Sequence, residues 1–304
     1  ILIDGFKSGF LRYLVDALHE TIISELRPKI VITFIDNNPR FGRLSEKFKG
    51  IKFIAVQNGC RSRWDTKEPC IHNIYLTFTN QESIRLNKLG WLINKSKSIG
   101  SLNAARVFSS LKRKKVKRDL LIISTWRGDI EIDDHYKNHF KANKEMHIFL
   151  SKLIYKEKYN AAIILREQKG NKHWFVKEFG MNEEEFHKNI YGDQCKIIEN
   201  QFIGENVYKE INDSNLSVAF LTSVILEGHI YGHNCLYLNF HDDNFYHDDF
   251  PKEIVISKKD KILIPLRMKE MINDSKNRNN EIYSISKARA KNTIYKFKKK
   301  INLD

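Results

Sequence analysis

The stretch SVAFLTSVILEGHIYGHNCLYLNF, from Ser217 to Phe240, predicts a β-α-β unit and therefore an α/β fold. Ser217–Leu221 and Leu236–Phe240 are apolar runs of strand length. Between them, Thr222 and Ser223 are residue types that cap helix N-termini, and an apolar helical face follows until a glycine ends it.

The turn between the first strand and the helix is the first candidate for a binding site. Backbone N–H groups and the helix dipole at such turns attract phosphate, so Thr222 and Ser223 are candidates for contacting one. Glu227 lies one helical turn further on, where a carboxylate reaches a sugar hydroxyl. The alternative is an ordinary helix cap, and on these residues alone both interpretations stay open.

Length and composition indicate a globular protein with two domains. The chain has 304 residues, of which 41% are hydrophobic and 29% charged. No apolar run approaches the roughly 20 residues of a membrane span, and no secretory signal is seen, so a cytoplasmic location is expected. Four cysteines without C-x-x-C spacing predict free thiols, with neither a zinc site nor a disulfide framework.

The formal net charge of +15 indicates an anionic partner, and two segments concentrate it. Lys112–Arg118 reads KRKKVKR and is either a solvated connector or a contact to membrane or phosphate. Lys287–Lys300 interleaves lysine and arginine with apolar residues, which is typical of an amphipathic interfacial helix. A terminal helix packed back on the protein has the same pattern.

Strands alternate with helices in both halves of the chain, which predicts two doubly wound domains. We expect a first domain over residues 1–110, a basic linker over 111–118, a second domain over 119–265 and a basic tail over 266–304. The tail is expected to begin with a loop at Asn273–Asn280 and to end in a helix. The expected strands are Ile30–Ile35, Ile51–Val56, Ile74–Phe78, Leu120–Ile123, Ala161–Leu165, Cys195–Ile198 and Glu253–Ser257, besides the two above.

Polar residues follow several of these strands, where α/β domains bind ligands. Asp36 follows the strand Ile30–Ile35, so it is a candidate general base or nucleophile; the alternative is the first residue of an Asx-turn. Gln57 and Asn58 are either a turn or amide donors that face a substrate. Ser124, Thr125 and Arg127 follow the first strand of the second domain, where arginine pairs with phosphate or carboxylate.

Metal and dinucleotide motifs are not evident. The acidic and histidine-containing segment at residues 241–249 resembles a metal cluster only by composition, because its ligands have no defined spacing, and no metal is expected. The chain contains no G-x-G-x-x-G fingerprint, no phosphate-binding P-loop and no G-x-S-x-G motif.

Taken in order, five motifs resemble those of GT-B glycosyltransferases, enzymes with two Rossmann-like domains facing across a cleft. The motifs are VITFIDNNPRFGRLS, KFIAVQNGCR, SIGSLN, LLIISTWRGD and FLTSVILEGHIYGHNCLYLNF. More narrowly, the set resembles bacterial surface-carbohydrate transferases of leptospiral and other polysaccharide clusters. These are similar to capsule and lipopolysaccharide transferases that use CMP-activated 2-keto sugars such as Kdo and other ulosonates. GT-B first domains usually begin with a strand and a glycine-bearing loop, whereas this sequence starts close to a helix, so part of that domain is expected to be missing from it.

The resemblance implies roles for the candidate residues. The second domain would hold the nucleotide of a CMP-linked donor without further cofactor, and the first domain would face the sugar and a glycan or lipid-linked acceptor, beside the inner face of the plasma membrane. Asp36 and Asn58 would be catalytic, and Asn37, Gln57 and Asn58 would bind substrate. The nucleotide contacts would come from Ser124, Thr125, Arg127, Thr222, Ser223 and Glu227.

Two rival functions stay open. A nucleotide-sugar epimerase of the same fold would act without a polymeric acceptor. A basic nucleic-acid-binding protein would account for the charge, but the basic residues lie in a linker and a tail, and no nucleic-acid-binding motif is present, so no nucleic-acid partner is expected.

Overall fold

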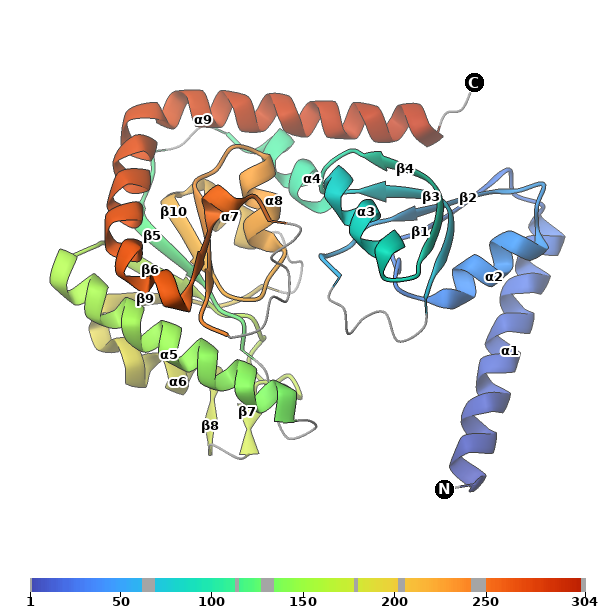
Figure 1. Cartoon of the computed structure of the whole chain (residues 1–304), viewed down its shortest axis with the longest axis horizontal. Helices are drawn as coiled ribbons and strands as arrows, with labels where there is room; N and C mark the ends of the chain where they lie inside the picture. The colour runs from blue at the N-terminus through green and yellow to red at the C-terminus, as the bar shows by residue number, and fades with distance from the viewer. Residues whose placement is uncertain are drawn as a thin grey trace. The chain divides into compact units, whose positions relative to one another are not determined.

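The chain divides into two compact units, Ile1–Ile99 (unit 1) and Gly100–Asp304 (unit 2) (Figure 1). The structure is a computed structural model that describes residues 2–61, 69–112, 115–126, 134–177, 180–201, 206–241 and 250–301. The division precedes helix α4 (Leu102–Ser110), so this helix belongs to unit 2, whereas the sequence places it at the end of the first domain.

Unit 1 is built on a parallel sheet of four strands in the order β1-β2-β3-β4. Its core is aromatic and aliphatic, with Phe53, Tyr75 and Trp91 almost completely buried. The elements are α1 (Leu2–Leu26), β1 (Ile30–Thr33), α2 (Pro39–Lys47), β2 (Lys52–Val56), β3 (Ile71–Thr77), α3 (Asn80–Lys88) and β4 (Leu92–Ser98).

Two strands of unit 1 differ from the sequence prediction. The first strand ends at Thr33 rather than Ile35, and Phe34 and Ile35 are exposed. Strand β4 was not predicted, because its sequence LINKSKS lacks the apolar run of a buried strand. It pairs with β3 along its whole length and lies at the edge of the sheet, where a polar strand is tolerated.

Unit 2 contains a parallel sheet of six strands in the order β12-β11-β10-β5-β6-β9. Central strand β10 is buried along its whole length and β5 over its last four residues, as expected of a sheet covered on both faces. The strands are β5 (Arg118–Ile123), β6 (Ala161–Ile164), β9 (Cys195–Ile198), β10 (Ser214–Ala219), β11 (Cys235–Asn239) and β12 (Val255–Ser257). The helices that follow α4 are α5 (Asp134–Glu157), α6 (Glu183–Tyr191), α7 (Asn206–Asn212), α8 (Val224–Ile230) and α9 (Ile264–Ile301), and β7 (Phe175–Val176) pairs with β8 (Met181–Asn182).

The long C-terminal helix α9 corrects the predicted loop at Asn273–Asn280, because the helix runs through it without a break. The segment is polar, yet Ile272 and Ser275 are buried, and the buried stripe continues at Ile282 and Ala290. A single buried stripe is enough to hold a helix whose other faces are solvated.

Helix α9 packs against α4, the first helix of unit 2. Tyr231 joins them, since its hydroxyl donates to the carbonyl oxygen of Ser101 (2.7 Å) and lies 3.1 Å from the Thr293 hydroxyl. The Tyr283 hydroxyl donates to the carbonyl of Leu111 at 2.9 Å. The basic C-terminal segment is therefore part of the domain rather than a separate tail.

All four cysteines are free thiols, and all four are buried. Among the described residues, no helix combines the length and the hydropathy that crossing a bilayer requires.

Candidate functional site

The sheet of unit 2 reverses its strand order between β5 and β10, and this position is where open α/β sheets bind ligands. The chain runs outward from β5 to β6 and β9, then returns to the other side of β5 as β10. Ile123 and Ala219 are paired at the carboxyl ends of these strands. The segments that follow, 124–126 and 220–223, therefore start side by side, although they are far apart in sequence.

The turn after β10 has an unusual backbone. Leu221 has a φ of 52°, in the left-handed region that branched and bulky residues avoid. Such strain persists only where the surrounding structure enforces it, and it is common at ligand sites. The next residue, Thr222, is half-buried, and its hydroxyl accepts from the backbone N–H of Val224 at 3.3 Å.

Glu227 is buried beneath this turn, with only 2% of its surface exposed. Its carboxylate accepts hydrogen bonds from the hydroxyls of Ser101 (2.5 Å), Tyr208 (2.6 Å) and Ser223 (2.8 Å). Burial raises the pKa of Glu227, whereas the three hydroxyls oppose that shift. In this arrangement Glu227 positions Ser223 and joins α8 to α4 and α7; direct contact between Glu227 and a ribose stays a prediction.

A buried carboxylate also accepts from a hydroxyl in the turn after β5. The Ser124 hydroxyl donates to the Glu183 carboxylate, lies 3.0 Å from Nε2 of His187 and accepts from the Trp126 N–H. Ser124 is buried, so it supports the turn, and Thr125 is the more exposed neighbour. Arg127 lies outside the described residues.

Glu183 is the residue of this site that the sequence analysis missed. It begins helix α6 and is completely buried, and its carboxylate accepts from the backbone N–H groups of Arg166 and Glu167, both at 2.8 Å, besides Ser124. One carboxylate thus ties together the turns that follow β5 and β6. Its signal in the sequence is the capping box of Asn182 and Glu185, which marks the start of α6.

Glu183 lies beside His187, whose ring packs against that of His147. Burial lowers the pKa of His187 well below its usual value and that of His147 to about 3, so neither ring carries a charge near neutral pH. Burial also raises the pKa of Glu183 to about 7, although its hydrogen bonds oppose the shift.

We expect the raised pKa of Glu183 to make folding stability fall as pH rises. The folded protein holds the Glu183 proton more tightly than the unfolded chain, so this stabilisation is complete below about pH 4.5 and is lost as pH rises to about 7. The difference corresponds to about 3 kcal/mol of unfolding free energy. Urea unfolding of the Glu183→Gln variant between pH 4.5 and 8 should lack this component, while Glu184→Gln, on the solvent side of the same helix, should keep it. An unchanged pH profile for Glu183→Gln contradicts the assignment.

In unit 1, the predicted catalytic residue Asp36 lies in a buried ion pair. Its side chain has no exposed surface, and its carboxylate accepts from the guanidinium of Arg61 and from the Tyr75 hydroxyl at 2.6 Å. Nε2 of His72 lies 2.9 Å from the Asp36 carbonyl oxygen, and burial lowers the pKa of His72 to about 4. Asp36 thus has a structural role in this arrangement, and its catalytic role stays a prediction.

The polar residues around Asp36 differ in exposure. Gln57 is buried: its side-chain oxygen accepts from the Phe78 N–H at 2.6 Å, and its amide group donates to the Gly59 carbonyl at 3.1 Å. Asn37 and Asn58 are exposed and accessible to a ligand, so substrate contact remains open for both. Among the described residues, no cluster of histidine, cysteine and acidic side chains is suited to hold a metal, and the segment 242–249 lies outside them.

Solved structures share the fold of this chain, whereas no family model and no curated protein matches it. One is described as a UDP-N-acetylglucosamine 2-epimerase from Listeria monocytogenes, with 12% identity over 96% of this chain and 80% of that chain and a TM-score of 0.60. S. aureus MnaA with UDP has 15% identity over 95% of this chain and 79% of that chain, with a TM-score of 0.56. The trehalose-6-phosphate synthase OtsA has 11% identity over 96% and 77% of the two chains, with a TM-score of 0.53. At these identities the likeness concerns the fold: two α/β domains with parallel sheets, as in the GT-B class, which confirms the predicted fold class.

Proposed function

We propose that the protein is an enzyme acting on a nucleotide-activated sugar. The nucleotide would bind at the carboxyl ends of the central strands β5 and β10 of unit 2. The observation that carries the proposal is the adjacency of the segments 124–126 and 220–223 at the position where the strand order reverses. Two segments predicted from sequence as nucleotide contacts thereby meet at one edge. Two of the solved structures that share this fold have UDP in their descriptions: the UDP-N-acetylglucosamine 2-epimerase from Listeria monocytogenes and S. aureus MnaA with UDP.

The proposed reaction is glycosyl transfer from a CMP-activated 2-keto sugar to a glycan or lipid-linked acceptor. This specificity rests on the sequence resemblance. In this transfer the bond between the anomeric carbon and the CMP phosphate oxygen breaks, the acceptor oxygen bonds to that carbon, and the hydroxyl proton passes to a general base, for which Asp36 is the candidate. CMP is the leaving group, and hydrogen-bond donors at the turns around Thr125 and Thr222 would stabilise its phosphate without a metal ion. Activity that survives EDTA is therefore expected, and loss of activity on chelation contradicts this part of the proposal.

Nucleotide binding is tested by a pair of substitutions at Thr222. Aspartate and asparagine both preserve an acceptor for the Val224 N–H, so both keep the turn capped. Only aspartate adds a negative charge, which repels a phosphate by about 4 kcal/mol at about 4 Å for an effective dielectric constant of about 20. Thermal shifts with CMP, UDP and their sugars should show that Thr222→Asp lowers nucleotide affinity at least tenfold while Thr222→Asn stays close to wild type. Equal nucleotide affinities for the two variants would mean that the nucleotide binds elsewhere. A rise in melting temperature with UDP but not with CMP would reject the CMP donor.

An epimerase is the second candidate, and one observation favours it. Among the structures compared above, the one with the highest TM-score is described as a UDP-N-acetylglucosamine 2-epimerase. The products separate the two reactions: a free or nucleotide-linked epimerised sugar without any acceptor indicates the epimerase, and a new glycosidic bond indicates the transferase.

Contact with an anionic membrane would bring the enzyme to a lipid-linked acceptor. Lys291, Lys298 and Lys299 are exposed on α9. Near an anionic surface each lysine contributes about 1 kcal/mol, so replacing all three with glutamate should weaken partitioning into anionic vesicles by about 3 kcal/mol or more. The matched control replaces the exposed Lys156, Lys169 and Lys196, which gives the same net charge. Equal co-sedimentation of the two triple variants refutes a specific role for α9.

A further inference from the structure

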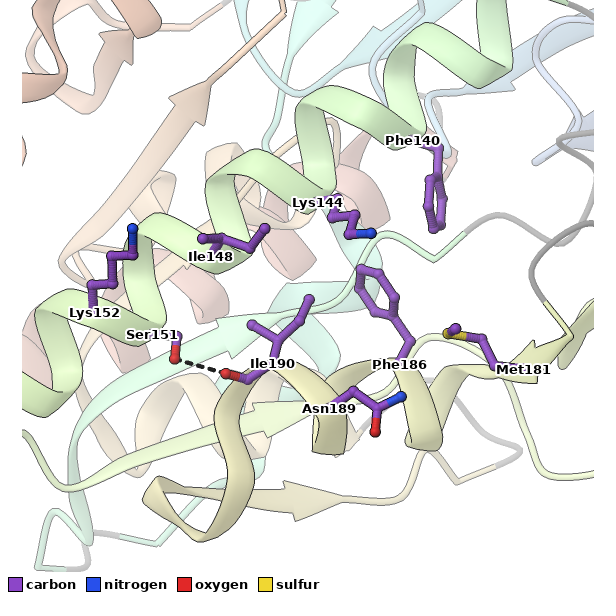
Figure 2. A pocket seen from close by; sticks show the side chains of 9 residues that line it. All are labelled: Phe140, Lys144, Ile148, Ser151, Lys152, Met181, Phe186, Asn189 and Ile190. Carbon is purple, nitrogen blue, oxygen red and sulfur yellow. Dashed lines mark hydrogen bonds between the residues drawn. The ribbon is translucent and has the colours of Figure 1, made fainter.

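A groove on the surface of unit 2 lies between α5 and α6, and its Phe140 and Phe186 pack against Trp126, which follows Thr125. Its volume is about 480 Å³, within the range of pockets that hold small molecules. Figure 2 shows Phe140, Met181 and Phe186 gathered at one end, with Ile148 and Ile190 facing each other in the middle. The groove therefore offers an apolar floor that no described side chain fills.

The wall formed by α5 adds positive charge to this apolar floor. Lys144 and Lys152 lie two helical turns apart on the same wall as Ile148, since a helix has about 3.6 residues per turn. Both ammonium groups belong to exposed residues, and neither makes an ion pair with a carboxylate in the described part of the chain. The carboxylates of this region are otherwise engaged: Glu145 pairs with Lys258, and Glu184 with Lys188.

The dimensions decide between a small ligand and a protein partner. Nine residues line the groove, whereas a stable protein interface takes roughly 20 to 30 residues from each side. An apolar chain that carries an anionic head matches both the floor and the lysines. A neutral apolar molecule would leave the two charges unpaired, and a free anion would leave the floor uncovered.

We infer that this groove binds one acyl chain of an anionic membrane lipid, with the head group at Lys144 and Lys152. Ile148 contacts the chain from the middle of the groove, and it is 40% exposed without a ligand. None of the residues that line the groove belongs to the segments 124–126 and 220–223, although Phe140 and Phe186 contact Trp126. The inference does not depend on which sugar the enzyme uses. The site also differs from the basic face of α9, because it requires an apolar chain in addition to charge.

The test uses single-chain lipids below their micellar concentration and the full-length protein. Lysophosphatidylglycerol and lysophosphatidylcholine of equal chain length share the acyl chain and the phosphate, but the glycerol head group leaves the first anionic and the choline makes the second zwitterionic. Calorimetric titration should show that the anionic lipid binds at least tenfold more tightly than the zwitterionic one and than glycerol phosphate. Equal affinity for the two lipids overturns the inference.

Substitutions then locate the site. Ile148→Asp and the double variant Lys144→Glu/Lys152→Glu should each lower the affinity for lysophosphatidylglycerol at least tenfold. Lys141→Glu is a control for a charge reversal elsewhere on the same helix, because Lys141 is exposed but does not line the groove. All four positions are on the surface, so unchanged melting temperatures are expected. Wild-type affinity in both groove variants, or an equal loss in Lys141→Glu, overturns the inference.

Discussion

Replacing Asp36 with asparagine is expected to destabilise unit 1 by about 3 to 5 kcal/mol, because one partner of a buried ion pair is removed. The substitution leaves the Arg61 guanidinium facing a neutral amide, with the Tyr75 hydroxyl still directed at the same position. Asp36 is completely buried, and removing one member of a buried ion pair costs more than the intact pair contributes. Urea denaturation, with hydrogen exchange in β3 as the local probe, measures this loss.

A second aspartate in unit 1 provides the control. Asp16 also pairs with an arginine, Arg40, but its side chain is 30% exposed. Asp16→Asn should therefore cost only about 0 to 1 kcal/mol, as expected of surface pairs. Equal losses for the two variants contradict the structural role of Asp36.

The catalytic assignment of Asp36 is tested on the same variant at a temperature at which it remains folded. As nucleophile or general base, Asp36 predicts a loss of turnover by orders of magnitude, with nucleotide affinity in unit 2 nearly unchanged. Near-normal turnover of the folded Asp36→Asn protein rules the assignment out and leaves the ion pair with Arg61 as the role of this residue.

The second large effect is expected at Ala290, in the middle of α9. Ala290 is completely buried, so Ala290→Asp places an unpaired carboxylate inside unit 2 and should cost more than about 3 kcal/mol. Ala288 is exposed two residues away, and Ala288→Asp should stay within about 1 kcal/mol of wild type. Thermal unfolding of the two variants measures the difference. Similar melting temperatures mean that α9 is dispensable for the fold of unit 2.

The parts of the fold that the sequence predicts are those whose signal is local. β10, α8 and β11 are predicted from the pattern of Ser217–Phe240, although β10 spans Ser214–Ala219 rather than the predicted Ser217–Leu221, and the Ser223 side chain does not cap α8. The loop predicted at Asn273–Asn280 is wrong, because α9 is held beside this segment by residues far away in sequence: Ile272 packs in the core with β10, and the Asn234 side chain donates to the Met271 carbonyl.

The sequence predicts which segments form the candidate site, but it does not predict which side chains contact one another there. A polar residue after an apolar strand points to the carboxyl edge of a sheet, which locates Ser124, Thr222 and Ser223. The contacts of each hydroxyl depend largely on partners elsewhere in the chain. Glu183, which accepts from the Ser124 hydroxyl, is far from Ser124 in sequence, so this pairing has no local signature. Glu227 lies one helical turn after Ser223 and is a local partner, but its other two partners, Ser101 and Tyr208, are not.

The packing of α4 against α9 has a consequence for how the protein is made. The Ser101 carbonyl and the Thr293 hydroxyl meet at Tyr231, so the helix that opens unit 2 is completed by one that the ribosome adds almost two hundred residues later. Until then Phe108 and Tyr231, which lie against each other in the finished unit, lack the cover of α9. Nascent chains with exposed apolar surface are prone to aggregate and bind chaperones. Slow translation between the codons for Gly100 and Thr293 should therefore lower the yield of folded protein more than slow translation within unit 1.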